Sequence, residues 1–205
     1  MIVPPSLDFL LPLMGFAAVS TVTPGPNNLM LTASGLNFGL RRSLPHLFGV
    51  WLGFPVMVLL VGVGLAGLFT RSPLLHQGLK LAGTAYILYL AFRIARQSPT
   101  PSPTLPSNAR PLRFWQAVAF QWVNPKAWVM AVGGTASYTT LAGNNFVEVC
   151  LISLTFLTVG LPSAFLWTGA GVAVRRWMSD PRHVRAFNIA MAVLLVASLL
   201  PMLRD

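Results

Sequence analysis

Six long apolar segments fill most of this 205-residue chain and limit what it can fold into. Hydrophobic residues make up 55% of the sequence and charged residues only 9%, too few to cover a water-soluble domain. About 20 apolar residues suffice to cross a bilayer as a helix. We therefore predict an all-α polytopic membrane protein with six transmembrane helices, over residues 7–33, 45–69, 74–95, 114–138, 146–172 and 184–203.

A proline- and serine-rich stretch, SPTPSPTLPSNARP, separates the third apolar segment from the fourth. Its composition favours a polar, non-helical connector. We therefore expect a single transmembrane domain over residues 1–205, with a first three-helix half at 1–97, a connector at 98–112 and a second three-helix half at 113–205. Because each half has three spans, the second would enter the membrane from the opposite side, as in an inverted repeat.

The basic residues are distributed unevenly between the gaps that separate the apolar segments. Ten of the 14 Lys and Arg residues lie in the first, third and fifth gaps, whereas the other gaps and the tails hold three. This bias predicts that the connector is cytoplasmic and that both termini lie on the other side of the membrane. Since no basic face joins these residues, the net charge of +10 does not indicate a nucleic-acid partner.

The first apolar segment contains the cluster TPGPNN, with Pro24, Gly25, Pro26, Asn27 and Asn28. Each proline lacks an N–H group and breaks a helix, which frees carbonyls before the break and N–H groups after it. In a membrane such a break must face protein or a water-filled cavity. Asn27 or Asn28 is expected to cap the restarting helix, whose N-terminus suits a carboxylate. We favour a substrate or gating site over a purely structural kink.

The fourth apolar segment contains a second polar cluster, QWVNPKAW, with Gln121, Asn124, Pro125 and Lys126. Lys126 would lie about 20 Å into a hydrocarbon core of about 30 Å, which makes it a candidate to bind a carboxylate or release a proton. The alternative is that its side chain extends to the far interface. Gln121 and Asn124 lie on nearly the same helical face as each other, so they could line a polar path with Lys126. Pro125 follows Pro24 by 101 residues, a weak internal echo between the halves.

Glycines in the second and third segments indicate close helix packing. Gly49 and Gly53 form a GxxxG motif, and Gly83 lies in the third segment. Small residues let membrane helices approach closely. The contact is expected either within one chain or between two copies, as in a homodimer.

The residues that usually carry catalysis or bind metals are sparse. The three histidines are far apart in sequence without an acid at ligand spacing, so we expect no metal and no cofactor. None of the four acids is clearly in mid-membrane, so proton coupling would need Lys126 or a path of hydroxyls and water, and otherwise the protein is a uniporter. An enzyme is not expected. A non-transporting scaffold or partner subunit is the alternative to a transporter, but it would not need polar residues at depth.

Several of these motifs resemble the LysE superfamily of amino-acid exporters. The stretch TPGPNNLML is similar to the first-helix signature of its homoserine/threonine-resistance branch. FGLRRSLPHLFGVWLGF, LAGTAYILYLAFRIA and FWQAVAFQWVNPKAW resemble its second, third and fourth helices, and FNIAMAVLLV more loosely its sixth. Within the branch, residues 23–54 and RFWQAVAFQWVN look most like the cysteine and O-acetylserine exporters.

The resemblance implies export of small amino acids or their derivatives across the bacterial inner membrane, driven by the proton-motive force. Both predicted outer termini would then be periplasmic. It also implies that the residues of the two polar clusters, 24–28 and 124–126, lie at the functional core. It assigns no site residue in the fifth segment, and no residue in the sequence selects one amino-acid side chain.

Overall fold

The computed structural model describes residues 7–65, 73–97, 110–139, 145–177 and 180–200. Every regular element in these ranges is helical, as the sequence predicts. Chain order gives α1 (Leu7–Val22), α2 (Pro26–Leu60), the π-helical turn η1 (Val61–Leu65), α4 (Pro73–Ala95), α5 (Phe114–Phe120), the 3₁₀ turn η2 (Gln121–Val123), α6 (Pro125–Tyr138), α7 (Asn145–Trp177) and α8 (Pro181–Ala197). Most of the expected connector, residues 98–109, lies outside the described residues.

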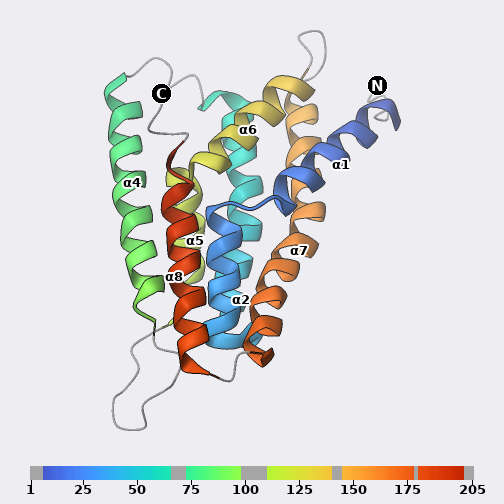
Figure 1. The fold of residues 1–205 in the computed structure, drawn as a ribbon. Coiled ribbons are helices and arrows are strands. Elements are labelled where there is room, and N and C mark those ends of the chain that lie inside the picture. The colour runs from blue at the N-terminus through green and yellow to red at the C-terminus, as the bar shows by residue number, and fades with distance from the viewer. Residues whose placement is uncertain (1–6, 66–72, 98–109, 140–144, 178–179, 201–205) are drawn as a thin grey trace.

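The long helix α2 is folded back on itself at Gly39. This residue has φ 76° and ψ 170°, a conformation that glycine adopts at little cost. In Figure 1 the blue first part of α2 and its cyan second part consequently run in opposite directions. The hydroxyl of Ser34 donates a 2.9 Å hydrogen bond to that of Ser43 across the turn. The expected gap between the first two apolar segments is therefore a tight turn between helices, not an open loop.

The first and fourth apolar segments are each interrupted, as their prolines predict. The first is divided into α1 and the start of α2 by residues 23–25. The fourth is divided into α5 with η2 and then α6, with the break at Asn124. In Figure 1 α1 and α6 both run obliquely at the end of the molecule where α1 begins and α8 ends. At each break the chain therefore changes direction, between α1 and α2 in the first half and between α5 and α6 in the second.

Helices α2 and α7 form the closest packed pair. Added side-chain carbons on Gly35 and Gly171 would collide with the backbone carbonyls of Thr168 and Thr32, respectively. Only glycine at both positions lets the two backbones approach this closely. On the other side of α2, α4 and α8 lie next to each other (Figure 1).

Apolar side chains cover much of the outer surface as well as the core. Buried residues include Leu31, Met57 and Phe156, whereas large apolar side chains on the outward faces are exposed. By length and composition, residues Pro26–Gly64 and Phe146–Trp177 are apolar enough to cross a membrane, and Phe9–Val22 forms a shorter apolar helix. An apolar exterior of this extent is expected of a protein surrounded by lipid.

Candidate functional site

The break in the first segment begins after Val22 and ends at Pro26. Gly25 is the N-cap residue of α2 and has an extended backbone, with φ −176° and ψ 176°. Pro26 follows at the first helical position, where its missing N–H group leaves no bond unmade. The sequence-based expectation that Asn27 or Asn28 caps this helix is wrong, since no side chain caps it.

Asn28 instead bonds to the end of α1. It is the third residue of α2, and side chains in a first turn lean back toward the helix N-terminus. Its amide nitrogen donates hydrogen bonds to the carbonyls of Thr21 (2.7 Å) and Thr23 (2.8 Å). Asn28 thus satisfies acceptors that the break leaves without backbone partners.

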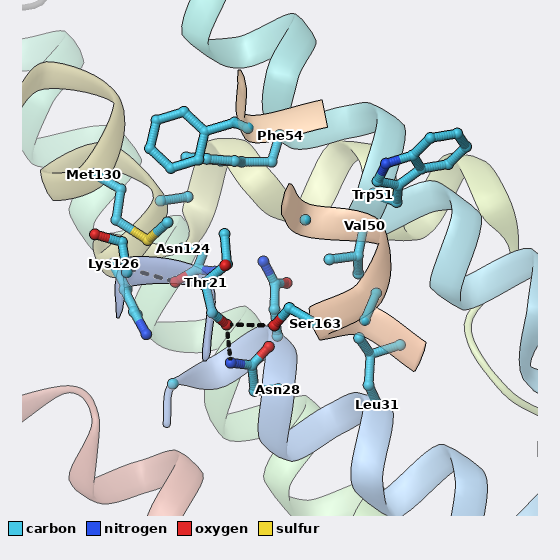
Figure 2. A pocket seen from close by; sticks show the side chains of 17 residues that line it. Thr21, Asn28, Leu31, Val50, Trp51, Phe54, Asn124, Lys126, Met130 and Ser163 are labelled. Carbon is cyan, nitrogen blue, oxygen red and sulfur yellow. Dashed lines mark hydrogen bonds between the residues drawn. The ribbon is translucent and has the colours of Figure 1, made fainter. Parts of the chain in front are cut away.

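Helix α7 supplies two further donors to the same helix end. The hydroxyl of Ser163 donates to the carbonyl of Thr21 at 2.8 Å. The indole N–H of Trp167 donates to the carbonyl of Val22 at 3.2 Å. Figure 2 shows Asn28 and Ser163 meeting at Thr21. Carbonyls freed by a helix break are therefore paired by side chains from α2 and α7.

Lys126 bonds to this helix end from the other half of the chain. Its ammonium donates to the carbonyl of Thr23 at 2.6 Å, to the Thr23 hydroxyl at 2.8 Å and to the carbonyl of Pro24 at 3.3 Å. The C-terminal end of a helix carries partial negative charge, which favours a cation there. The side chain of Lys126 thus lies at the break in the first segment and does not extend away from it.

The break in the second half repeats this construction. Asn124 is the N-cap residue of α6, with φ −92° and ψ 111°, and Pro125 follows at the first helical position. The side chain of Asn124 accepts a 3.2 Å hydrogen bond from the backbone N–H of Lys126. By position, the counterpart of Pro125 is Pro26 and not Pro24 as the sequence echo suggested.

An amide pair joins the two breaks directly. Asn27 donates to the side-chain oxygen of Gln121 at 2.8 Å, and Gln121 donates back to Asn27 at 3.3 Å. Gln121 is fully buried and also donates to the carbonyl of Ala117 at 2.9 Å. Two clusters that are 94 residues apart in sequence are therefore in contact.

A cavity lies between the breaks and α7, and its empty space of about 550 Å³ includes a part that is open to the surroundings (Figure 2). Its polar lining comprises Ser20, Thr21, Asn27, Asn28, Asn124, Lys126 and Ser163, and its apolar lining includes Leu31, Val50, Trp51, Phe54, Met130 and Phe156. Gly25 also lines the cavity. Pro24, Pro26, Gln121 and Pro125 are not in the lining and instead shape or brace it.

Comparison with known proteins identifies the family. The model of the LysE type translocator family matches residues 18–199, nearly the whole chain. The chain belongs to the LysE type translocators. The cysteine/O-acetylserine efflux proteins of Escherichia coli (strain K12) and Shigella sonnei (strain Ss046) are each 32% identical to it over 181 residues, 88% of this chain and 90% of theirs. No solved structure matches the chain significantly.

Family membership makes this protein a transporter and not an enzyme. It also confirms the resemblance found in the sequence motifs. Among the described residues of this LysE type translocator, no three His, Cys, Asp or Glu side chains are grouped so that they could hold a metal ion.

The glycines singled out in the sequence lie at contacts within this translocator chain. Gly49 lies against the carbonyl of Phe114, and an added side-chain carbon on Gly53 would lie 2.9 Å from Cα of Val118, both in α5. An added carbon on Gly83 would lie 2.7 Å from the carbonyl oxygen of Val123. These glycines bring α2 and α4 against the interrupted fourth segment.

Sequence reasoning missed the contribution of α7. Ser163 and Trp167 lie in the fifth apolar segment, in which the sequence analysis found no motif that resembles the family. One signal was available, because Pro162 followed directly by a serine is a polar interruption in an apolar run. The Gly35 and Gly171 contact that brings α7 against α2 was also not singled out.

Proposed function

We propose that this chain exports small neutral amino acids or their derivatives across the bacterial inner membrane. The substrate would be of the cysteine/O-acetylserine kind or the threonine/homoserine kind. The main support for this proposal is the cavity at the two helix breaks, which offers both hydrogen-bond donors and acceptors. The names of the relatives, which are efflux proteins for cysteine and O-acetylserine, support this substrate class. A scaffold without transport is not favoured, because membership in a translocator family argues against it.

The membrane arrangement that we propose has six spans in two inverted halves, 1–97 and 113–205. Figure 1 shows six runs that alternate in direction when α1 is taken with the first part of α2, and α5 with α6, and it shows α1 beginning at the same end at which α8 ends. Arg93 lies in the last turn of α4, Arg113 is the N-cap residue of α5 and Arg176 lies in the last turn of α7. Figure 1 shows these three helix ends at the opposite end of the molecule. With arginines on the cytoplasmic side, both termini are periplasmic. The matching roles of Pro26 and Pro125 support the repeat.

Substrate binding in this cavity would use both charges of an amino acid. The ammonium would take the carbonyls of Thr23 and Pro24, which lie outside the cavity lining and which Lys126, a lining residue, occupies in this structure. The displaced Lys126 ammonium and the N-terminus of α2 would then hold the carboxylate. Phe54 and Met130 provide apolar surface for a short side chain. Lys126 is in this scheme an internal substitute for the substrate ammonium.

Proton coupling is part of the proposal, with Lys126 as the group that would exchange the proton. Of the acids whose surroundings are described, Glu148 lies in the first turn of α7 and Asp180 caps α8. Both are remote in sequence from the breaks. A homodimer, if formed, would use outer apolar faces, since Gly49 and Gly53 pack against α5 of the same chain.

Proteoliposomes test the function. Vesicles containing the purified chain and labelled O-acetyl-L-serine, L-threonine or L-homoserine are placed under an imposed pH gradient, and release is followed with time. We expect release of at least one substrate, faster with the gradient than without it. If none of the substrates is released with or without the gradient, the export proposal is contradicted. If release is equal in both conditions, export stands and only its coupling to protons is contradicted.

A further inference from the structure

A second cavity lies at the arginine-bearing end of the molecule. Its empty space of about 360 Å³ includes a part that is open to the surroundings. It is lined by the first part of α2, by His46 after the turn at Gly39, by the C-terminal part of α4 with Gln97 beyond it, and by residues 110–112. Met30 lines this cavity and the neighbouring Leu31 lines the cavity at the breaks, so consecutive residues of one helix face the two spaces.

His46 faces this second cavity without a hydrogen-bond partner. The side chain is 2% exposed, and neither ring nitrogen bonds to any atom of the described residues. Buried polar atoms in native proteins are nearly always paired, so an unpaired ring that lines a cavity points to a ligand or water there. A histidine ring always offers at least one N–H donor.

Gln97 presents a second unpaired polar atom to the same cavity. Its side-chain oxygen is buried and has no partner in the described part of the chain. Its backbone is anchored, because Asn188 donates to the Gln97 carbonyl at 3.3 Å. Asn188 is in turn held by a reciprocal amide pair with Asn37, at 2.8 and 2.9 Å. The main chain of Gln97 is therefore fixed while its side-chain acceptor stays free.

Two arginines give the cavity its positive charge. Arg93 and Arg110 both line it, and the Arg93 guanidinium donates to the Arg110 carbonyl at 3.5 Å. None of the lining residues that the structure describes is acidic. A guanidinium group pairs well with a carboxylate, which it can contact with two hydrogen bonds.

We propose that this cavity is a second binding site for an α-amino acid, occupied on the arginine-bearing side before transfer to the cavity at the helix breaks. Arg93 and Arg110 bind the carboxylate, the Gln97 oxygen accepts from the ammonium, and His46 bonds to whichever group reaches it. Met30 and Leu112 provide apolar surface for the side chain. This inference rests on the proposed export function and adds a site to it.

Equilibrium binding of labelled O-acetyl-L-serine tests the second site. The full chain is placed in nanodiscs of phosphatidylcholine alone, and bound ligand is counted per chain. We expect two sites in the native protein, one in Lys126→Met and one in the double variant Arg93→Gln/Gln97→Leu. The matched control is Arg96→Gln, which lies directly after the end of α4 and is not among the residues that line the cavity, and it should keep two sites. The double variant should also raise KM for export by about tenfold or more.

The outcomes separate this site from the export proposal. If the native chain exports substrate but the double variant still binds at two sites with an unchanged KM, the second-site proposal is overturned and the export proposal stands. Absence of both binding and export in the native chain overturns both proposals. Competition in Lys126→Met tests what the second site binds. If inorganic phosphate displaces the label as effectively as unlabelled O-acetyl-L-serine does, the site binds a lipid headgroup or a simple anion, and the assignment is overturned. Weaker displacement by phosphate, propionate and propylamine supports it.

Discussion

The ammonium of Lys126 lies 2.6 Å from the carbonyl oxygen of Thr23, 103 residues away in sequence. This contact joins the helix that restarts in the second half to the helix that ends in the first. A charge-assisted hydrogen bond of this kind is stronger than a neutral one. Among the described residues, Lys126 is the only lysine near the breaks, and this contact holds its ammonium at an acceptor that a substrate ammonium could also use.

Replacing Lys126 by methionine should abolish most export while the chain stays folded. Methionine keeps much of the apolar stem but removes three donors, and hydrogen bonds to charged groups contribute about 1.5–3 kcal/mol. We expect export of labelled O-acetyl-L-serine from proteoliposomes to fall about 10- to 100-fold. Lys80→Met, on α4, is the matched control and should keep native rates. Native export by Lys126→Met contradicts a role for the ammonium.

Gly25→Ala should disturb Lys126 without straining the backbone. Gly25 has an extended conformation that any residue adopts, but an added side-chain carbon would lie 2.5 Å from Cδ of Lys126. The lysine must therefore move off its acceptors, and we expect a higher KM or a lower export rate at nearly native thermal stability. Gly133→Ala, with open space around the added carbon, should behave as the native chain. Equal export by both variants is the contrary result.

Asn27 and Gln121 should be energetically coupled. They form a reciprocal amide pair between the two breaks, and each single alanine variant removes both hydrogen bonds of this pair, although Gln121 keeps its bond to the carbonyl of Ala117. In a double-mutant cycle on unfolding in detergent, we expect a coupling free energy of about 0.6–1.7 kcal/mol, between the average and the largest value measured for hydrogen bonds between membrane helices in such cycles. Additive effects would mean that the pair does not hold the breaks together.

The helical elements and their breaks follow closely from the sequence, because proline and apolar run length act locally. Gly39 was harder to identify, since one positive φ value converts an expected loop into a tight turn within a helical run. The expected role of Asn28 as a cap failed for a geometric reason. Pro26 moved the helix start one position earlier, so that Asn28 reached back to α1.

The two polar clusters of the cavity could be identified from the sequence, but not their partners. Lys126 and Asn28 are conspicuous because polar groups are rare in apolar segments. Ser163 and Trp167 are ordinary residues of a membrane helix, and only tertiary packing brings them to the end of α1. His46 is similar, since its lack of a partner is a property of the folded chain.

Asn28 and Ser163 should act together, because both donate to the carbonyl of Thr21. Either single alanine variant leaves that part-buried acceptor one partner, and each hydrogen bond lost should lower the free energy of unfolding by about 0.5–1.5 kcal/mol, with Asn28→Ala also losing its bond to Thr23. The double variant removes both donors and should cost more than the sum, because an unpaired carbonyl adds about 1–3 kcal/mol. Unfolding in detergent measures all three.

The control for this pair is Thr158→Ala, whose hydroxyl bonds only to carbonyls of its own helix. It should change stability by less than either single variant. Export should fall in Asn28→Ala beyond its effect on folding, because Asn28 also donates to Thr23, the acceptor that Lys126 uses. If the losses of unfolding free energy in the double variant are strictly additive and Asn28→Ala exports at the native rate, the C-terminal end of α1 is not part of the proposed site.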